Sequence, residues 1–181
     1  MGGSKRHAAD GSPMIHVCSL ARLHATVEKT GARHIVTFIR ESYLVRRPSG
    51  VALDNHLLLA VDDISMPLEG HTVPATEHVE ALIRFVRGWD RATPLVIHCF
   101  AGISRSTAGA FVTVCALNPQ RDEVEIAQAL RTASPTATPN ARIVEIADQL
   151  LGRGGRMRAA VDAIGRGAEA LEAAPFRLEI R

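Results

Sequence analysis

Short apolar runs alternate with amphipathic segments along most of this chain, and this alternation restricts its fold more than any other feature. The apolar runs cover residues 14–20, 33–39, 56–61 and 94–98, and helix patterns cover residues 21–31, 74–90, 104–117, 140–151 and a segment that Asp122 begins. Strands that alternate with helices are typical of a parallel sheet covered on both faces. We therefore predict one α/β domain with a central, mostly parallel sheet and helices on both faces.

The polar and glycine-rich stretches suggest where that domain begins and ends. Residues 1–13 are small, polar and rich in Gly and Ser, and we expect them to be a disordered leader or a remnant of an expression tag. Glycines within residues 152–155 interrupt the last strong helix pattern, and an Ala-rich, weakly helical stretch follows. We therefore assign the domain to residues 14–151 and a C-terminal helical tail to residues 152–181.

Composition excludes several kinds of partner. The formal net charge is +2 and only 4% of the residues are aromatic, so we expect no nucleic-acid binding. No apolar stretch is long enough to span a membrane, so we expect no membrane partner. The cysteines (Cys18, Cys99 and Cys115) are few and show no CxxC spacing, which favours reduced thiols in a cytoplasm.

The chemistry is concentrated where the apolar run at residues 94–98 meets a helix. Cys99 follows the strand, and Arg105 and Ser106 open the helix. The residues between them are Phe100, Ala101, Gly102, Ile103 and Ser104. A loop from a strand into a helix N-terminus can turn several N–H groups toward one point, where they bind a phosphate-sized anion. Gly102 lets the backbone curl, and Arg105 can grip two phosphate oxygens at once.

The same positive field acts on the sulfur of Cys99. Helix N-termini and neighbouring cations lower the pKa of cysteine thiols to roughly 3.5–7.5. We therefore expect Cys99 to be a thiolate at neutral pH, at the floor of an anion pocket. Ser106 can donate a hydrogen bond to that sulfur, which helps a thiolate to depart.

At this point the chain resembles a known family. The C-x5-R-S pattern inside His98–Ser106 resembles the signature of the cysteine-dependent protein phosphatases (the protein tyrosine phosphatase superfamily), most of all its compact dual-specificity branch. The later residues Thr138, Pro139, Asn140, Gln149 and Leu150 also resemble the ending of that branch. The resemblance covers about residues 17–151, and it predicts a strand, a phosphate loop and a helix in that order.

The resemblance implies a phosphomonoester hydrolase with a phosphocysteine intermediate, acting on phosphotyrosine and in second place on phosphoserine or phosphothreonine. It implies that Cys99 is the nucleophile, that Arg105 and the loop residues Phe100–Ser104 bind the phosphate, and that Ser106 assists breakdown of the intermediate. His98 and Asn140 are expected to support this loop.

The resemblance also requires an upstream aspartate as general acid, and two candidates stand side by side. Asp62 and Asp63 both follow the strand at residues 56–61. We favour Asp63, because it lies further out of the strand and opens the loop at residues 63–70, which could act as a lid.

Other readings stay open. The chain could be a phosphate-binding module that recognises a phosphorylated partner without turnover, or a rhodanese-like sulfurtransferase, and a small-molecule phosphate could be the substrate. Cys18 could act as a resolving thiol for Cys99. Loop 40–53 matches nothing in the family, and the surroundings of Tyr43 do not resemble the phosphotyrosine loop of the large tyrosine-specific enzymes. We expect no cofactor and no metal, and the oligomeric state cannot be read from the sequence.

Overall fold

The computed structural model describes residues 14–181, so the prediction for residues 1–13 lies outside the described part of the chain. The strands are β1 (Met14–Ser19), β2 (His34–Phe38), β3 (His56–Leu59), β4 (Leu95–Cys99) and β5 (Phe176–Glu179). The α-helices are α1 (Leu23–Thr30), α2 (Thr76–Gly88), α3 (Arg105–Leu117), α4 (Glu123–Ala133), α5 (Ala141–Leu150) and α6 (Arg156–Ile164). Short 3-10 turns at Leu20–Arg22 and Leu53–Asn55 precede α1 and β3.

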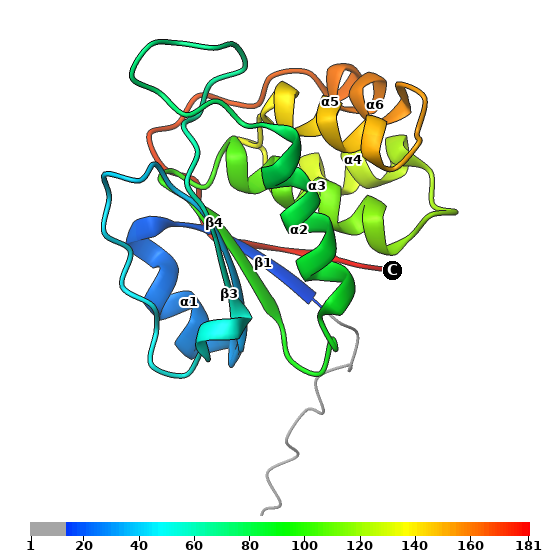
Figure 1. The fold of residues 1–181 in the computed structure, drawn as a ribbon. Helices are drawn as coiled ribbons and strands as arrows, with labels where there is room; N and C mark the ends of the chain where they lie inside the picture. Colours follow the sequence, from blue (N-terminus) through cyan, green and yellow to red (C-terminus); the bar gives the residue numbers. More distant parts are fainter. Residues whose placement is uncertain (1–13) are drawn as a thin grey trace, which may run out of the picture.

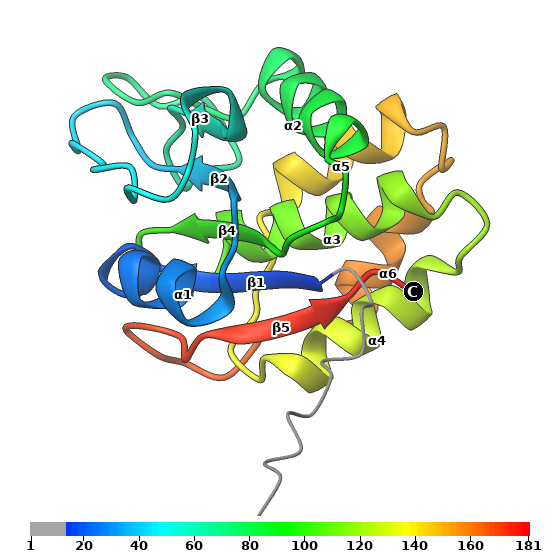
Figure 2. The same cartoon turned by 90° about the horizontal axis from the view of Figure 1, so that it is seen from below.

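The strands form one sheet in the order β3-β2-β4-β1-β5 (Figures 1 and 2). The pairs β1–β4, β2–β4 and β2–β3 are parallel, and β5 runs antiparallel to β1. The predicted α/β fold with a mostly parallel sheet is therefore confirmed. The predicted strand at residues 56–61 is shorter in the structure, because β3 ends at Leu59.

Both faces of the sheet are covered, and the strand side chains alternate between them. On one face, α1 packs over a small cluster that includes Leu23, Ile35, Val51 and Val96. On the other face, side chains such as Ile97 join the main core under α2–α6. The central strand β4 is buried at every position, as expected of a parallel strand between two helical layers. None of the helices within residues 14–181 is both long and apolar enough to cross a membrane.

The crossover from β3 to β4 determines where the functional loops lie. Helix α2 connects these strands, and both run parallel to β2 between them. The loop after β3 and the loop after β4 therefore open on the same edge of the sheet. Helix α2 begins at Thr76 rather than at Pro74, which precedes the N-cap Ala75.

The C-terminal residues differ from the expected helical tail. Residues 156–164 form α6, which contributes Met157 and Ala160 to the main core. Residues 165–175, which we call the C-terminal strap, run back across the molecule and lead into β5. Residues 176–179, expected to be part of the helical tail, instead pair with β1 and extend the sheet. An edge-strand pairing with the N-terminal strand is a long-range event that a four-residue pattern does not predict.

A buried ion pair and a buried carboxylate attach this segment to the preceding helices. Arg153 Nη1 donates to Glu123 Oε1 at 2.6 Å, and both side chains are only 5% exposed. The Asp148 carboxylate accepts hydrogen bonds from the backbone N–H groups of Gly155 and Met157 at 2.6 and 2.7 Å. These contacts hold the glycine turn between α5 and α6 in one conformation, so α6 continues the core.

Gly109 allows α3 to approach the sheet closely. A Cβ at this position would lie 2.5 Å from Cε2 and 2.9 Å from Cζ of the buried Phe38. Gly109→Ala gains about 1 kcal/mol of helix propensity but overpacks the core at a cost of about 1–3 kcal/mol. We therefore predict that the substitution lowers the free energy of unfolding, measured by urea denaturation.

Gly88 at the end of α2 provides the matched control, because a Cβ there has no neighbour within 4 Å. Gly88→Ala should raise the free energy of unfolding by a few tenths to about 1 kcal/mol. A Gly109→Ala protein as stable as the Gly88→Ala protein would contradict the close contact between α3 and Phe38.

Candidate functional site

Cys99 and Arg105 are placed by the junction of β4 and α3. Cys99 is the last residue of β4, and α3 begins at Arg105 with Ser104 as its N-cap. The predicted strand, loop and helix are therefore present in that order. Residues 99–105 form the loop between them, which we call the anion loop.

The carbonyl groups of the anion loop are bonded to segments that surround it. The Phe100 carbonyl accepts from Leu20 N–H at 3.1 Å, and the Ala101 carbonyl accepts from Ala173 N–H at 2.9 Å. The Ile103 carbonyl accepts from Thr138 N–H at 2.9 Å, and the Ser104 carbonyl accepts from Asn140 N–H at 3.2 Å. With its carbonyls held outward, the loop can direct its N–H groups toward the centre, where α3 adds its positive end.

The sulfur of Cys99 lies at that centre. Its Sγ accepts a hydrogen bond from Gly102 N–H at 3.3 Å, and Ser106 Oγ lies 3.1 Å from it. Gly102 has a positive φ of 75°, and a Cβ there would lie 3.0 Å from the backbone of Cys18 and Ser19. Only glycine satisfies both conditions, which explains the residue at this position.

The guanidinium of Arg105 is buried beside the anion loop and keeps part of its hydrogen-bonding capacity. Its side chain is 8% exposed, and Nη1 donates to the Val61 carbonyl at 2.8 Å. Its Nε has no hydrogen-bond partner among residues 14–181. A buried donor without a partner is costly in a folded protein, so the site is suited to an acceptor such as a phosphate oxygen.

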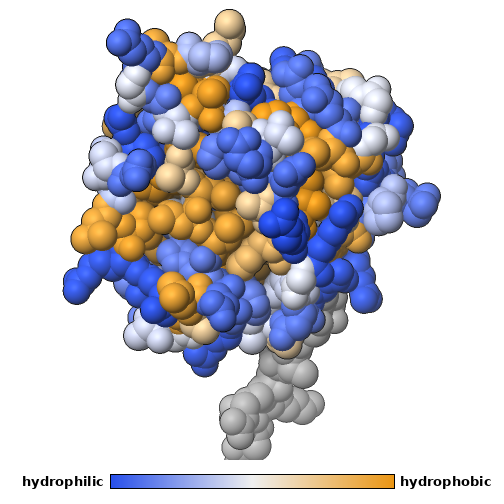
Figure 3. All heavy atoms as spheres, viewed as in Figure 1, coloured by the Kyte–Doolittle hydropathy of each residue, from blue (hydrophilic) through white to orange (hydrophobic). Residues whose placement is uncertain are grey.

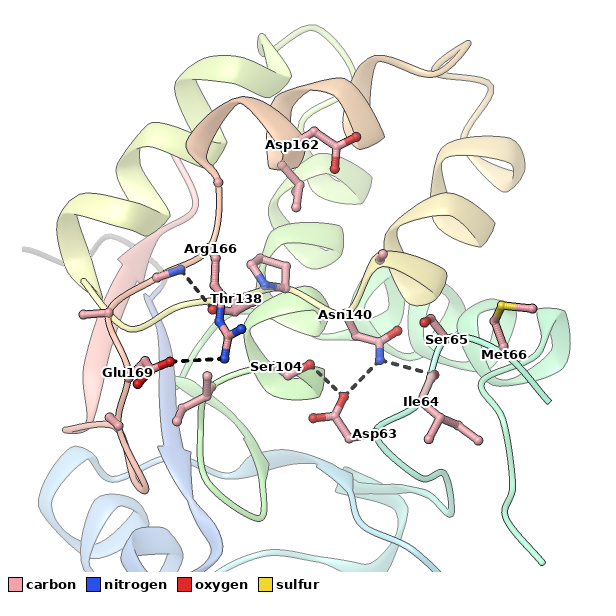
Figure 4. Close-up of a pocket in the computed structure, with 18 of the residues that line it drawn as sticks. Asp63, Ile64, Ser65, Met66, Ser104, Thr138, Asn140, Asp162, Arg166 and Glu169 are labelled. Carbon is pink, nitrogen blue, oxygen red and sulfur yellow. Dashed lines mark hydrogen bonds and ion pairs between the residues drawn. The ribbon is translucent and has the colours of Figure 1, made fainter. Parts of the chain in front are cut away.

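The structure separates the two candidate aspartates. Asp63 Oδ1 accepts from Ser104 Oγ at 2.7 Å and from Asn140 Nδ2 at 3.0 Å, so this carboxylate lies against the anion loop (Figure 4). Asp62 is buried and closes its own loop instead: Oδ2 accepts from Thr72 N–H at 2.8 Å, and Oδ1 pairs with Arg40 at 3.3 Å. Both aspartates border the pocket at Arg105, but the Asp62 carboxylate holds its own loop, whereas the Asp63 carboxylate is bonded to the anion loop.

Asn140 joins the loop of Asp63 to α5. Its Oδ1 accepts from Ile143 N–H at 3.2 Å and so caps α5, which fixes the orientation of the amide. Its Nδ2 then points to Asp63 and to the Ile64 carbonyl. Asn140 was expected to be a supporting residue, and it lies where it can position the Asp63 carboxylate.

His98 lies behind the anion loop and is fully buried. Its Nε2 is hydrogen-bonded to Thr37 Oγ1 at 2.7 Å, and its Nδ1 lies 3.4 Å from the Cys99 carbonyl. Burial lowers the pKa of His98 from 6.5 to about 4, so the ring is neutral at neutral pH. A neutral ring held on both sides can orient the end of β4 but adds no charge to the site.

The two other cysteines are in environments that suppress the thiolate. Burial raises the pKa of Cys18 to about 11 and that of Cys115 to about 12. Cys18 lies on β1, next to the anion loop, but a protonated thiol attacks slowly. The idea that Cys18 resolves an oxidised Cys99 stays a prediction. Within residues 14–181 no three His, Cys, Asp or Glu side chains gather as a metal site would require.

Loop 40–53 is placed beside the site, which the sequence did not predict. A pocket of about 310 Å³ is lined by Arg40, Tyr43, His71, Phe100, Arg105 and both aspartates, together with Ile39 and Ile64. Tyr43 and Phe100 have ring centroids 5.6 Å apart, and the two side chains are 49% and 54% exposed. Strands β2 and β4 are neighbours, so the loops that follow them meet at the mouth of this pocket.

Comparisons with known proteins agree with this geometry. Residues 69–138, which include β4, the anion loop and α3, match the family model of the protein-tyrosine phosphatases. No curated protein sequence matches the chain at a significant level.

Solved structures of dual-specificity phosphatases share the fold. A human DUSP28 structure has a TM-score of 0.60 at 18% identity, covering 80% of this chain and 90% of that one. A mouse putative dual specificity phosphatase, complexed with zinc tungstate, has a TM-score of 0.60 at 18% identity, covering 88% of this chain and 98% of that one. A structure of PTPMT1 in complex with PI(5)P has a TM-score of 0.59 at 15% identity, covering 86% of this chain and 95% of that one.

The family match covers the anion loop, and the shared fold extends over most of the chain. The resemblance noted in the sequence is therefore confirmed: the chain is similar to the cysteine-dependent protein tyrosine phosphatases, and its fold is that of their compact dual-specificity branch.

Proposed function

We propose that this protein hydrolyses phosphate monoesters through a phosphocysteine intermediate. The observation that carries the proposal is the convergence of Cys99 Sγ, the buried guanidinium of Arg105 and the Asp63 carboxylate on one loop. A sulfurtransferase has no use for a carboxyl group in this place, whereas ester hydrolysis needs a proton donor beside the leaving oxygen.

In the first step, the Cys99 thiolate attacks phosphorus, and the bond between phosphorus and the ester oxygen breaks. The loop N–H groups and Arg105 bind the equatorial oxygens, where negative charge is concentrated in the transition state. Asp63, in its protonated form, transfers its proton to the departing oxygen. The products are the free alcohol or phenol and an S-phosphorylated Cys99.

In the second step, water attacks the phosphorus of the intermediate, and the phosphorus–sulfur bond breaks. The Asp63 carboxylate accepts a proton from that water, which restores the acid. Ser106 Oγ, 3.1 Å from Cys99 Sγ, donates a hydrogen bond to the departing thiolate. Inorganic phosphate then leaves the anion loop.

For the substrate, we propose phosphotyrosine in proteins, with phosphoserine or phosphothreonine as a weaker possibility. The support is the pair of exposed aromatic rings, Tyr43 and Phe100, on the pocket that also holds Arg105. An aryl ring esterified to the bound phosphate could pack against these rings and gain contact area that a short serine side chain cannot. The mouse relative, with its bound tungstate, and the anion loop support a tetrahedral oxyanion as the ligand.

For the compartment, we propose the cytoplasm. All three cysteines are free thiols in the structure, which supports a reducing environment.

The test of the reaction class is hydrolysis of an aryl phosphate in rapid-mixing experiments. We predict a burst of phenol equal to the enzyme concentration if hydrolysis of the intermediate is slow, and steady turnover in any case. Cys99→Ser should lower kcat at least about a thousandfold, and Arg105→Lys about a hundredfold or more, because lysine lacks the planar fork. A different result would favour a phosphate-binding module: the wild-type protein shows no turnover, and the Cys99→Ser protein still binds inorganic phosphate.

The identity of the acid is tested by the pH dependence of the same reaction. Asp63→Asn should lower kcat by about 10²–10³-fold and remove the limb of the pH–rate profile that depends on the protonated acid. Asp62→Asn should keep that limb and instead lower the free energy of unfolding by about 1–2 kcal/mol, because Asp62 bonds to Thr72 and Arg40. If Asp62→Asn removes the limb and Asp63→Asn does not, the assignment is reversed.

A further inference from the structure

A large groove, whose lining does not include Tyr43, adjoins the anion loop. One wall is the loop at residues 64–68 after β3, and the other is the part of the C-terminal strap at residues 165–171. Its floor includes Ile103 and Ser104 of the anion loop, together with Thr138, Pro139 and Asn140 (Figure 4). Its volume is about 1260 Å³, against about 310 Å³ for the pocket at Arg105. The groove is therefore far larger than a phosphoryl group and one aryl ring require.

The strap wall of this groove is fixed at both ends. Near its start, Gly167 N–H donates to Thr138 Oγ1 at 3.1 Å, and Ala168 N–H donates to the Pro135 carbonyl at 2.9 Å. Near its end, Ala173 N–H donates to the Ala101 carbonyl at 2.9 Å, and Ser19 Oγ donates to Glu172 at 2.6 Å. The wall is thus held in place, and the residues between these anchors are exposed and line the groove.

Those intervening residues offer groups that suit a peptide. No hydrogen bond within residues 14–181 uses the backbone N–H groups of Glu169, Ala170 or Leu171. Exposed backbone groups of this kind can pair with the backbone of an extended peptide. A lipid chain or a free small phosphate ester has no peptide backbone with which these N–H groups could pair.

Large apolar side chains stand on both walls of the groove. Leu171 is 99% exposed on the strap, and Met66 and Leu68 are 74% and 56% exposed on the opposite loop. Figure 3 shows apolar surface at the top of the view, where the loop at residues 64–68 lies. Exposed apolar groups that face one another across a groove indicate a surface that another molecule covers.

Of the charged side chains that line the groove, Asp63 is bonded to the neutral Ser104 and Asn140, and the others are in ion pairs. Among residues 14–181, Arg166 is the only arginine that lines it, and it pairs with Glu169 at 3.8 Å (Figure 4). Asp162 pairs with Arg158 at 2.9 Å. Within residues 14–181 the lining thus holds no cluster of arginine or lysine that could bind an anionic membrane or a polyphosphate, and away from Asp63 the groove matches an uncharged occupant.

We infer that this groove binds an extended, uncharged and largely apolar peptide segment next to the phosphorylated residue of a protein substrate. The inference rests on the proposed function, because it takes the phosphorylated residue to be held by the anion loop. Since Ile103 and Ser104 belong both to that loop and to the groove floor, the bound segment continues directly from the phosphorylated residue.

The experiment compares synthetic phosphotyrosine peptides of equal length whose flanks are either Leu/Val-rich, Gly/Ser-rich or Asp-rich, on each side of the phosphotyrosine in turn. We expect an apolar flank on one side to raise kcat/KM at least about tenfold over a Gly/Ser flank, the effect of burying about one leucine side chain. Leu171→Asp should reduce this ratio about fivefold or more. Leu53→Asp is the matched control, because Leu53 is 73% exposed and lies outside the groove, and it should leave the ratio unchanged.

Two further measurements separate this inference from the proposed function. Turnover of a small aryl phosphate reports the proposed function alone. Binding of the same peptides to the Cys99→Ser protein, measured by fluorescence polarisation, reports the groove without turnover and should show the same order of flanks.

Equal kcat/KM and equal binding for all three flanks would overturn the inference, as would a Leu171→Asp protein with the wild-type ratio. Faster hydrolysis of a phosphoinositide in phosphatidylserine vesicles than of every peptide would also overturn it, because the groove would then face a membrane.

Discussion

The arrangement of the anion loop depends on where its carbonyl groups are bonded. Leu20, Thr138, Asn140 and Ala173 each donate a backbone N–H to one of these carbonyls. The donors come from three distant parts of the chain, including the C-terminal strap. Because the carbonyls are held outward, the N–H groups and the end of α3 can act together on the sulfur of Cys99. The rest of the fold, from the sheet order to the strap, brings these four donors to one place.

The position of the Asp63 carboxylate depends on residues at the same helix ends that surround the anion loop. Ser104, at the N-cap position of α3, donates its hydroxyl to Asp63, and Asn140 both caps α5 and donates to Asp63. The carboxylate is therefore positioned by two helix N-termini rather than by its own loop alone. The loop at residues 63–70 contains proline and glycine, and these two contacts can still hold the Asp63 carboxylate in the defined position that the proposed reaction needs.

Much of the fold around the anion loop, and the candidate residues on that loop, could be predicted from the sequence, because the motifs that indicate them are short and contiguous. The strand, the C-x5-R-S loop and the helix are contiguous, so Cys99, Arg105 and Ser106 could be placed together without knowledge of the rest. The preference for Asp63 over Asp62 followed from its position after a strand. The structure places the two carboxylates in different hydrogen bonds, and the choice of Asp63 as the acid stays a prediction. The strand β5 and the position of Tyr43 could not be predicted. Each depends on pairing or packing between segments far apart in the sequence, and neither leaves a periodic pattern.

The most direct test of the central claim is the rate at which iodoacetamide alkylates Cys99 as a function of pH, with the Cys99→Ser protein as the blank. If the loop N–H groups and Arg105 stabilise the thiolate, the rate should already be at its plateau at pH 7, and inorganic phosphate should slow it. A free thiol with a pKa of about 8.5 is only a few per cent ionised at pH 7. A rate that climbs nearly tenfold from pH 7 to pH 8, with no protection by phosphate, would contradict the account.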